Sequence, residues 1–233
     1  MMEQLLCLDA VEKTFTMHLQ GGLRIPVVRN VAFAVDAGEC VALGGPSGIG
    51  KSSILKMIYA NYRCDGGRIL VLDGKENVDI AAAEPRRVID LRRRLIGYVS
   101  QFLRVIPRVP AVEIVAHEAR QAGASDAEAL CAARCLLARL NLPERLWRLP
   151  PATFSGGEQQ RVNIARGFAG RHRILLLDEP TASLDATNRD VVIGLIDEKK
   201  RDGVAIVGIF HDRDVRERVA DRVLDVTTFA KAA

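Results

Sequence analysis

Residues 45–52 constrain the fold of this chain more than any other stretch, because they read Gly-Pro-Ser-Gly-Ile-Gly-Lys-Ser. A glycine, four residues, a glycine, a lysine and then a serine or threonine is the pattern of a phosphate-binding loop. In such a loop backbone N–H groups point at a triphosphate, and the helix that follows adds the positive end of its dipole. The apolar residues 40–43 predict a strand before the loop, and residues 53–59 have apolar positions spaced for a helix after it. The sequence therefore predicts an α/β fold that binds a nucleoside triphosphate.

The residues of this loop have separate expected roles. Lys51 would reach the β and γ phosphates, and the hydroxyl of Ser52 would be a ligand of Mg²⁺. The alternative, a glycine-rich turn with an exposed lysine, does not explain why a strand and a helix flank the loop. Ile49 is bulkier than the small residues usual at its position. The predicted nucleotide contacts in this stretch are Gly45, Pro46, Ser47, Gly48, Ile49, Gly50, Lys51, Ser52 and Ser53.

The composition is that of an ordinary globular protein. The chain has 233 residues, 48% hydrophobic and 27% charged, and we expect residues 1–233 to form a single domain with a helical insertion. No apolar run approaches the roughly eighteen residues needed to cross a bilayer. The acidic Glu3 stands where a signal peptide is basic, so we expect a cytoplasmic protein without direct membrane insertion. The net charge of +4 is too small to indicate a nucleic-acid partner.

The cysteines predict neither disulfides nor a metal site. No Cys-x-x-Cys pair is present, and although Cys131 and Cys135 could share a helix face, no pair of histidines accompanies them. We expect free thiols that behave as buried small apolar groups, and no structural metal.

Two stretches before the loop predict antiparallel strands. Apolar and polar residues roughly alternate over residues 5–15 and 25–35, with Gly21 and Gly22 between them. Phe15 could stack on an adenine ring or pack in the core as a strand residue, and the sequence favours neither interpretation. Further along, residues 68–74 predict another strand that ends in a turn.

A basic helix and a strand come next. Residues 85–94 predict a helix that carries Arg86, Arg87, Arg92, Arg93 and Arg94. A run of this kind is more often a solvated helix face than a docking surface for a partner. Residues 95–101 then predict a strand whose last residue, Gln101, has a side-chain carbonyl suited to Mg²⁺ or to an attacking water.

Between about residues 102 and 154 the pattern becomes helical. Ser125 and Glu128 match a capping box ahead of the periodic apolar positions Leu130, Ala133, Leu137 and Leu140. We expect a helical subdomain of about residues 102–168 inserted into a core of about residues 1–101 and 169–233. Near its end a helix opens with Ser-Gly-Gly-Glu, which predicts an anion site, although an ordinary serine cap would look the same. The residues of this second anion site are Ser155, Gly156, Gly157 and Glu158.

Two apolar stretches end in polar residues suited to chemistry on a triphosphate. Residues 173–179 predict a buried parallel strand that delivers Asp178 and Glu179 to the edge of a sheet. Asp178 would hold Mg²⁺, while Glu179, expected to point the other way on the strand, would orient and deprotonate the attacking water. Residues 205–211 predict a similar strand ending in His211, which could contact the γ phosphate.

The order of these motifs over nearly the whole chain resembles an ABC-type ATPase domain. That resemblance implies an α/β fold with a RecA-like core, an N-terminal antiparallel sheet and a helical subdomain, with ATP and Mg²⁺ as cofactors. It assigns the Walker A motif to residues 45–52, the Q-loop to Gln101, the signature to residues 155–158 and Walker B to residues 174–178. It also implies that Asp185 belongs to a D-loop of residues 183–185, that Glu179 is the catalytic glutamate and that His211 is the switch histidine. Glu158 stands where the family commonly has glutamine, and no loss of ATP contact is expected from it.

The resemblance extends to one branch, the L subunits of the carbon-phosphorus lyase system for phosphonate breakdown. Four segments carry it: residues 59–62, 99–108, 140–147 and 207–212. It implies an ATPase, dimeric with itself or a sister ATPase, that works with soluble lyase subunits in forming ribose 1-methylphosphonate 5-triphosphate. The alternative is the ATPase subunit of a membrane importer or lipoprotein exporter, which has the same catalytic residues. A module in which ATP only joins two chains is less compatible with the acids Asp178 and Glu179.

Overall fold

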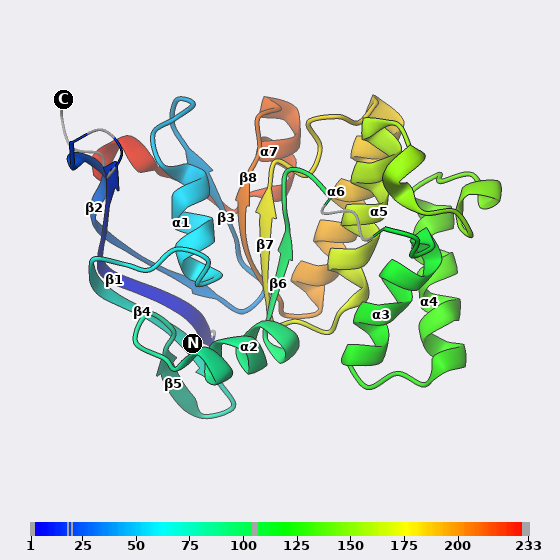
Figure 1. Ribbon diagram of the computed structural model, residues 1–233, viewed down its shortest axis with the longest axis horizontal. Helices are drawn as coiled ribbons and strands as arrows, with labels where there is room; N and C mark the ends of the chain where they lie inside the picture. Colours follow the sequence, from blue (N-terminus) through cyan, green and yellow to red (C-terminus); the bar gives the residue numbers. More distant parts are fainter. Residues whose placement is uncertain (1–2, 18, 20, 104–106, 230–233) are drawn as a thin grey trace.

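Two β-sheets organise the chain. The computed structural model describes residues 3–17, 19, 21–103 and 107–229. In the described part of the chain, one sheet is antiparallel with strand order β2-β1-β4-β5, and the other is parallel with order β6-β7-β8-β3-β9. The antiparallel sheet lies on one side of the parallel sheet and the long helices lie on the other (Figure 1). The strands are β1 (Gln4–Met17), β2 (Leu23–Asp36), β3 (Cys40–Gly44), β4 (Gly66–Asp73), β5 (Glu76–Asp79), β6 (Ile96–Val99), β7 (Ile174–Asp178), β8 (Ala205–Ile209) and β9 (Arg222–Asp225).

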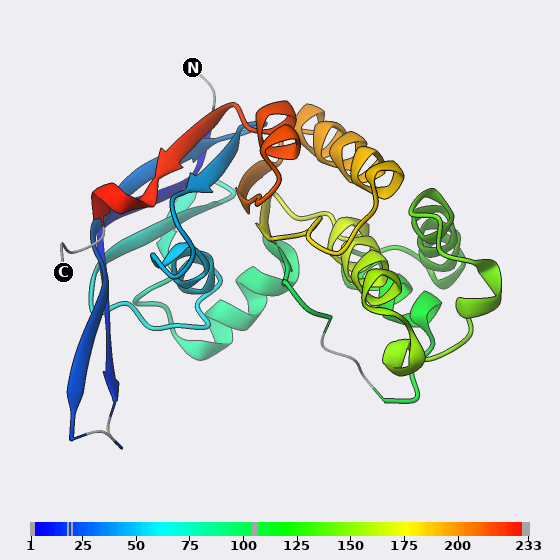
Figure 2. The same cartoon turned by 90° about the horizontal axis from the view of Figure 1, so that it is seen from above.

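The helices fall into two groups. Near the antiparallel sheet lie α1 and α2, and α3 to α6 lie beyond the parallel sheet, as the view from above in Figure 2 shows. Short 3₁₀ turns connect some of them and close the described part of the chain. The helical elements are α1 (Lys51–Ile58), α2 (Pro85–Arg94), α3 (Ala111–Gln121), α4 (Asp126–Arg139), η2 (Glu144–Leu146), η3 (Pro151–Thr153), α5 (Gly156–Ala169), α6 (Ala186–Arg201), α7 (Arg213–Val219) and η4 (Val226–Phe229).

The parallel sheet separates two hydrophobic cores because successive side chains of a strand point to opposite faces. On β7, Ile174 and Leu176 pack on the side of α1 and the antiparallel sheet. Leu175 and Leu177 pack on the side of α3, α4, α5 and α6. All of β3, β7 and β8 is buried, as expected for parallel strands covered on both faces. Because these strands are parallel, their carboxyl ends meet at one edge of the sheet, where Glu179 follows β7 and His211 follows β8.

Several sequence expectations about the elements are confirmed. The helix over residues 85–94 and the antiparallel pairing of the two N-terminal strands are both present. Ser125 and Glu128 form the expected capping box on α4, and Ala133, Leu137 and Leu140 are buried.

Other expectations about the elements are wrong. The helical region begins only at Ala111, since residues 102–103 and 107–110 are not helical and residues 104–106 lie outside the described part. Cys131 and Cys135 are exposed on α4 rather than buried, whereas Cys40 is buried and Cys7 and Cys64 are partly buried.

The five cysteines are free thiols. Among the described residues, no helix has the length and apolar character needed to span a bilayer.

Candidate functional site

The phosphate-binding loop has the backbone that its glycines allow. Gly48 and Gly50 have φ values of 81° and 110°, in the left-handed region that residues with a Cβ rarely adopt. Gly50 is the N-cap of α1, so the turn delivers the chain directly into the first turn of that helix. Ile49, the bulky residue of the loop, is partly buried against the core on the α1 side, which explains its size.

The loop brings its lysine and its serine to different partners. Lys51 is only 9% exposed, and its Nζ donates hydrogen bonds to the carbonyl oxygens of Gly45 and Pro46, at 2.7 and 2.8 Å. Ser52 Oγ donates to Asp178 Oδ1 at 3.0 Å, which joins the start of α1 to the end of β7. Two residues far apart in the sequence thus form one hydrogen-bonded pair.

The Ser52–Asp178 pair suits Mg²⁺. A hydroxyl and a carboxylate are hard oxygen ligands, and Mg²⁺ is usually held by one or two carboxylates together with substrate phosphates and water. Asp178 is 4% exposed, so its charge is largely shielded from solvent. Among the described residues, no cluster of three or more His, Cys, Asp or Glu is arranged to hold a metal.

Three residues predicted to be catalytic lie together beside this pair. His211 Nε2 lies 2.9 Å from Glu179 Oε1, and Gln101 Nε2 donates to Glu179 Oε2 at 3.0 Å. Gln101 follows β6, Glu179 follows β7 and His211 follows β8, and these strands are neighbours in the sheet. Within the described residues the side chain of Gln101 hydrogen-bonds to Glu179 and to neither Ser52 nor Asp178, so its role as a Mg²⁺ ligand stays a prediction.

The expected strand geometry for these three residues is wrong in detail. β6 ends at Val99 and β8 at Ile209, two residues before Gln101 and His211 respectively. Glu179 lies just beyond β7 with a left-handed φ of 53°, while its N–H donates to Ile209 O. Its direction therefore comes from this backbone turn and not from alternation along the strand.

A hollow of about 300 Å³ extends from the phosphate-binding loop to Glu179 and His211. That volume is at the lower end of the range for small-molecule sites. Phe15 lies at its wall, with its ring edge-on to Tyr62 at a centroid distance of 5.2 Å, so it is available for stacking and also packs against a neighbour. The lining residues are Phe15, Val27, Ser47, Gly48, Gly50, Lys51, Ser52, Ser53, Glu179 and His211.

The second predicted anion site is built at the start of α5, away from this hollow. Ser155 accepts a hydrogen bond from Glu158 N–H, and Glu158 Oε2 accepts from Ser155 N–H at 2.8 Å, which is a capping box. These hydrogen bonds hold the pKa of the Glu158 carboxyl below its usual value. Gly156, Gly157 and the Ser155–Glu158 pair do not line the hollow. Asp185 caps α6 by accepting from Asn188 N–H and does not line it either.

Sequence reasoning missed Tyr98. Its hydroxyl donates to Asp178 Oδ2 at 2.9 Å, from the neighbouring strand β6. A tyrosine within an apolar strand is itself a signal, because a buried phenol requires a hydrogen-bond partner. The sequence does not say that β6 lies beside β7, and therefore could not identify Asp178 as that partner.

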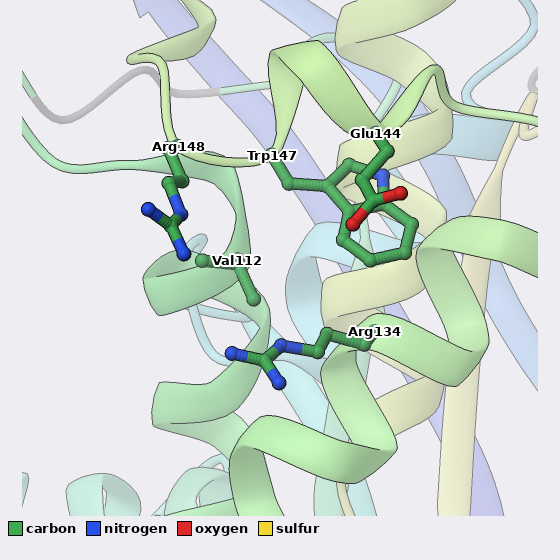
Figure 3. Close-up of a pocket in the computed structure, with 5 residues that line it drawn as sticks. All are labelled: Val112, Arg134, Glu144, Trp147 and Arg148. Carbon is green, nitrogen blue, oxygen red and sulfur yellow. The ribbon is translucent and has the colours of Figure 1, made fainter.

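A second hollow, of about 180 Å³, lies in the helical region and contains none of the predicted nucleotide contacts. Arg134 of α4 and Arg148 point to the space beside Val112 of α3, with Glu144 and Trp147 on its other side (Figure 3). Glu144 and Trp147 belong to one of the segments that resemble the phosphonate lyase subunit.

The comparison with protein families identifies the class to which this chain belongs. A family model described as ABC transporter matches residues 28–182, more than half of the chain. The chain therefore belongs to the ABC transporter ATPase family, and its two sheets and helical region form the ABC cassette fold. Members of this family bind ATP with Mg²⁺ and hydrolyse it.

Curated relatives belong to transport systems. The lipoprotein-releasing system ATP-binding protein LolD of Maricaulis maris is 38% identical over 224 residues, which cover 96% of this chain and 93% of that protein. LolD 2 of Caulobacter vibrioides is 42% identical over 86% of each chain. The macrolide export ATP-binding/permease protein MacB of Brucella melitensis is 38% identical over 95% of this chain but only 33% of its own length. The chain thus spans nearly all of LolD and about a third of MacB.

Solved structures support the same family. The ATP-binding cassette MJ0796, in a dimeric post-hydrolysis state bound to ADP and Pi, matches with a TM-score of 0.82 and 29% identity over 95% of both chains. Another dimeric structure of that cassette gives a TM-score of 0.85 at 30% identity.

These relatives do not support the expected phosphonate-lyase assignment. They favour the alternative, an ABC transporter ATP-binding subunit, because LolD and MacB are named for lipoprotein release and macrolide export.

Proposed function

We propose that this chain is the ATP-hydrolysing subunit of an ABC transporter of the lipoprotein-release or exporter kind, and that it works as a dimer. The observation that carries the hydrolytic role is the position of Glu179, which hydrogen-bonds to Gln101 and His211 and lines the same hollow as Lys51 and Ser52. A carboxylate held at the edge of a triphosphate site is suited to act as a general base.

The residues of this site would divide the reaction. Lys51 and the N–H groups at the start of α1 bind the phosphates, and Ser52 with Asp178 holds Mg²⁺, which neutralises phosphate charge when bound. Glu179 accepts a proton from a water as the water oxygen bonds to the γ phosphorus and the bond to ADP breaks. His211 contacts one carboxylate oxygen of Glu179 and Gln101 contacts the other. Held on both sides, the carboxylate keeps its direction toward the water.

The dimer would complete the site. Ser155, Gly156 and Gly157 present a helix N-terminus outside the hollow of their own chain, and a helix N-terminus favours an anion. In a two-fold dimer the start of α5 in each chain could face the nucleotide of the other. The MJ0796 cassette, which matches over 95% of this chain, was solved as a dimer.

The kind of partner assembly is proposed from the relatives. This chain matches LolD over nearly the whole length of LolD, and it matches about a third of the ATP-binding/permease protein MacB. Both relatives belong to transport systems, which favours a membrane permease as the partner of this chain. A second candidate is the ATPase subunit of the carbon-phosphorus lyase system, favoured by residues 59–62, 99–108, 140–147 and 207–212. Both candidates have the same hydrolytic site and differ in what the dimer docks onto.

Two measurements test these proposals. Purified protein should hydrolyse ATP in the presence of Mg²⁺, and absence of turnover in assembled complexes would contradict the hydrolytic role. Affinity purification from native cells should bring down integral membrane permease subunits, whereas copurification of soluble phosphonate-lyase subunits would replace the transporter with the second candidate.

A deletion strain separates the two candidates independently. If the partner is the lyase system, cells lacking this chain should take up labelled methylphosphonate normally and yet fail to grow on it as sole phosphorus source. If the partner is a lipoprotein-release or export permease, growth on methylphosphonate should be unaffected by the deletion. Normal growth would therefore exclude the lyase candidate.

A further inference from the structure

Both oxygens of the Asp178 carboxylate are held by hydroxyl groups from different elements. Ser52 Oγ donates to Oδ1 at 3.0 Å and Tyr98 Oη donates to Oδ2 at 2.9 Å. On β6, Tyr98 pairs in register with Leu176, and Leu176 and Asp178 share one face of β7 because they are two residues apart. The sheet register therefore directs the phenol at this carboxylate.

The hydrogen bond from Tyr98 to this carboxylate is of a strong kind. A phenol O–H that donates to a carboxylate oxygen makes a charge-assisted hydrogen bond, which is stronger than a hydrogen bond between two neutral groups.

The ring of Tyr98 is held in turn by residues that reach the surface. Tyr59, the C-cap of α1, packs on it with a centroid distance of 5.0 Å and an interplanar angle of 31°. Arg92 of α2 lies over the ring of Tyr59, with its Cζ 4.5 Å from the ring centroid. The Nε of Arg92 also donates to Tyr59 O at 2.7 Å. Arg92 also donates to Asn61 Oδ1, which fixes the guanidinium.

We propose that Tyr98 is a positioning residue for the Mg²⁺-binding carboxylate, and that Tyr59 and Arg92 connect this carboxylate to the surface of α2. With Ser52 as the single donor, the Asp178 carboxylate could rotate about its Cβ–Cγ bond. A donor on each oxygen fixes the plane of the carboxylate. Partner residues that hydrogen-bond a metal ligand commonly affect metal affinity in this way. The proposal rests on the proposed function, in which Asp178 and Ser52 hold Mg²⁺ with ATP.

The direct test removes one hydroxyl. Tyr98→Phe keeps the ring that packs on Tyr59 and loses only the donor to Asp178 Oδ2. Binding of a non-hydrolysable ATP analogue would be measured in EDTA and across a Mg²⁺ titration. We expect nearly unchanged affinity in EDTA and a Mg²⁺ midpoint about tenfold higher, the lower end of the 10- to 100-fold loss seen when such partners are removed.

Tyr62→Phe is the matched control, because it removes the same group from a ring whose hydroxyl makes no hydrogen bond with the described residues. Its Mg²⁺ midpoint should equal that of the unaltered protein. An equal midpoint in Tyr98→Phe would overturn the proposal. If the unaltered protein bound the analogue with no dependence on Mg²⁺, the proposed function itself would fail, which is a different result.

A second pair of variants tests the connection to the surface. Arg92→Ala removes the contact with Tyr59 and should raise the Mg²⁺ midpoint about two- to fivefold, as expected from the strength of an exposed cation–π pair. Arg93→Ala alters the exposed neighbour, whose side chain makes no ion pair or hydrogen bond with the described residues, and should leave the midpoint unchanged. Equal midpoints in the two variants would overturn the connection through Tyr59.

Discussion

At the scale of single residues, Glu179 has an unusual backbone for its type. A left-handed φ of 53° costs a residue with a Cβ about 1–2 kcal/mol relative to the right-handed region. Its N–H donates to Ile209 O on β8, and its two carboxylate oxygens contact Gln101 and His211, so three contacts hold this conformation. Strain of this kind concentrates at functional sites, where the surrounding structure fixes it.

Glu179→Gln should keep ATP affinity and slow hydrolysis by about 10²- to 10⁴-fold, because the amide cannot accept the proton from water. The amide retains hydrogen-bonding groups for Gln101 and His211, so the backbone turn should persist. Steady-state phosphate release and nucleotide binding measure the two effects separately. Turnover at the normal rate would show that another group is the base.

His172 should make the stability depend on pH. It lies against Gly97 and Gly170, its Nδ1 is buried without a hydrogen-bond partner among the described residues, and burial together with Lys199 lowers its pKa from 6.5 to about 4. Below pH 6.5 the unfolded chain binds a proton at His172 that the folded protein excludes. The free energy of unfolding should therefore fall as the pH falls from about 6.5 to about 4, by at most about 1.4 kcal/mol per pH unit.

Urea unfolding at a series of pH values measures this slope. In His172→Gln the slope over the same window should be shallower, because the substituted side chain does not titrate. The same slope in both proteins would assign the effect to other groups.

At the scale of elements, α5 joins the helical region to the parallel sheet by close packing. Its glycine, Gly167, lies so near β6 that a Cβ there would come within 2.3 Å of Val99 Cγ2. Asn163 on the same helix donates to Ser100 O, directly after β6. The helix that carries the predicted signature is therefore fixed to the strand that leads to Gln101.

Two glycines in helices should respond oppositely to alanine. Gly167→Ala should destabilise the protein by about 1–3 kcal/mol, because overpacking forces β6 or α5 to move. Gly194→Ala on α6 has open space around the new methyl group and should stabilise by about 0.5–1 kcal/mol, the usual advantage of alanine within a helix. Chemical denaturation of both variants measures the difference. A stabilising effect at Gly167 would contradict the packing of α5 on β6.

At the scale of the whole molecule, the proposed dimer gives each chain two halves of different nucleotide sites. The hollow at the phosphate-binding loop contains Lys51 and Glu179, while Ser155 at the start of α5 lies outside it. If the proposed dimer forms, each site combines the loop of one chain with the α5 start of the other. Neither chain would then be complete alone.

Mixing two inactive variants tests this arrangement. Lys51→Ala disables the loop and Ser155→Arg obstructs the start of α5, so each variant alone should be inactive. In a mixed two-fold dimer both substitutions fall in one site and the other is intact, so an equal mixture should recover roughly a quarter of normal activity. Phosphate release from the mixture measures this, with mixed dimers demonstrated by differential tags. No recovery despite mixed dimers would indicate sites built within single chains.

Much of the candidate site was predictable from the sequence because its signals are local. The loop of residues 45–52 needs glycines at particular backbone positions, and the capping box of Ser125 and Glu128 follows from residues three apart. Apolar runs that end in Asp178 and His211 predicted polar groups at the carboxyl edge of a parallel sheet. The family resemblance was equally visible, because it depends on the order of short motifs.

The tertiary structure alone decided what depends on neighbours distant in the sequence. The order of strands β6, β7 and β8 brings Gln101, Glu179 and His211 together and directs Tyr98 at Asp178, and sheet order follows from long-range packing that no local pattern encodes. The left-handed turn at Glu179 is set by its contacts with Ile209, Gln101 and His211, so alternation along the strand gave the wrong geometry. The exposure of Cys131 and Cys135 was also decided by how α4 packs. Residue type determines which side chains prefer burial, but it does not determine which face of a helix is buried.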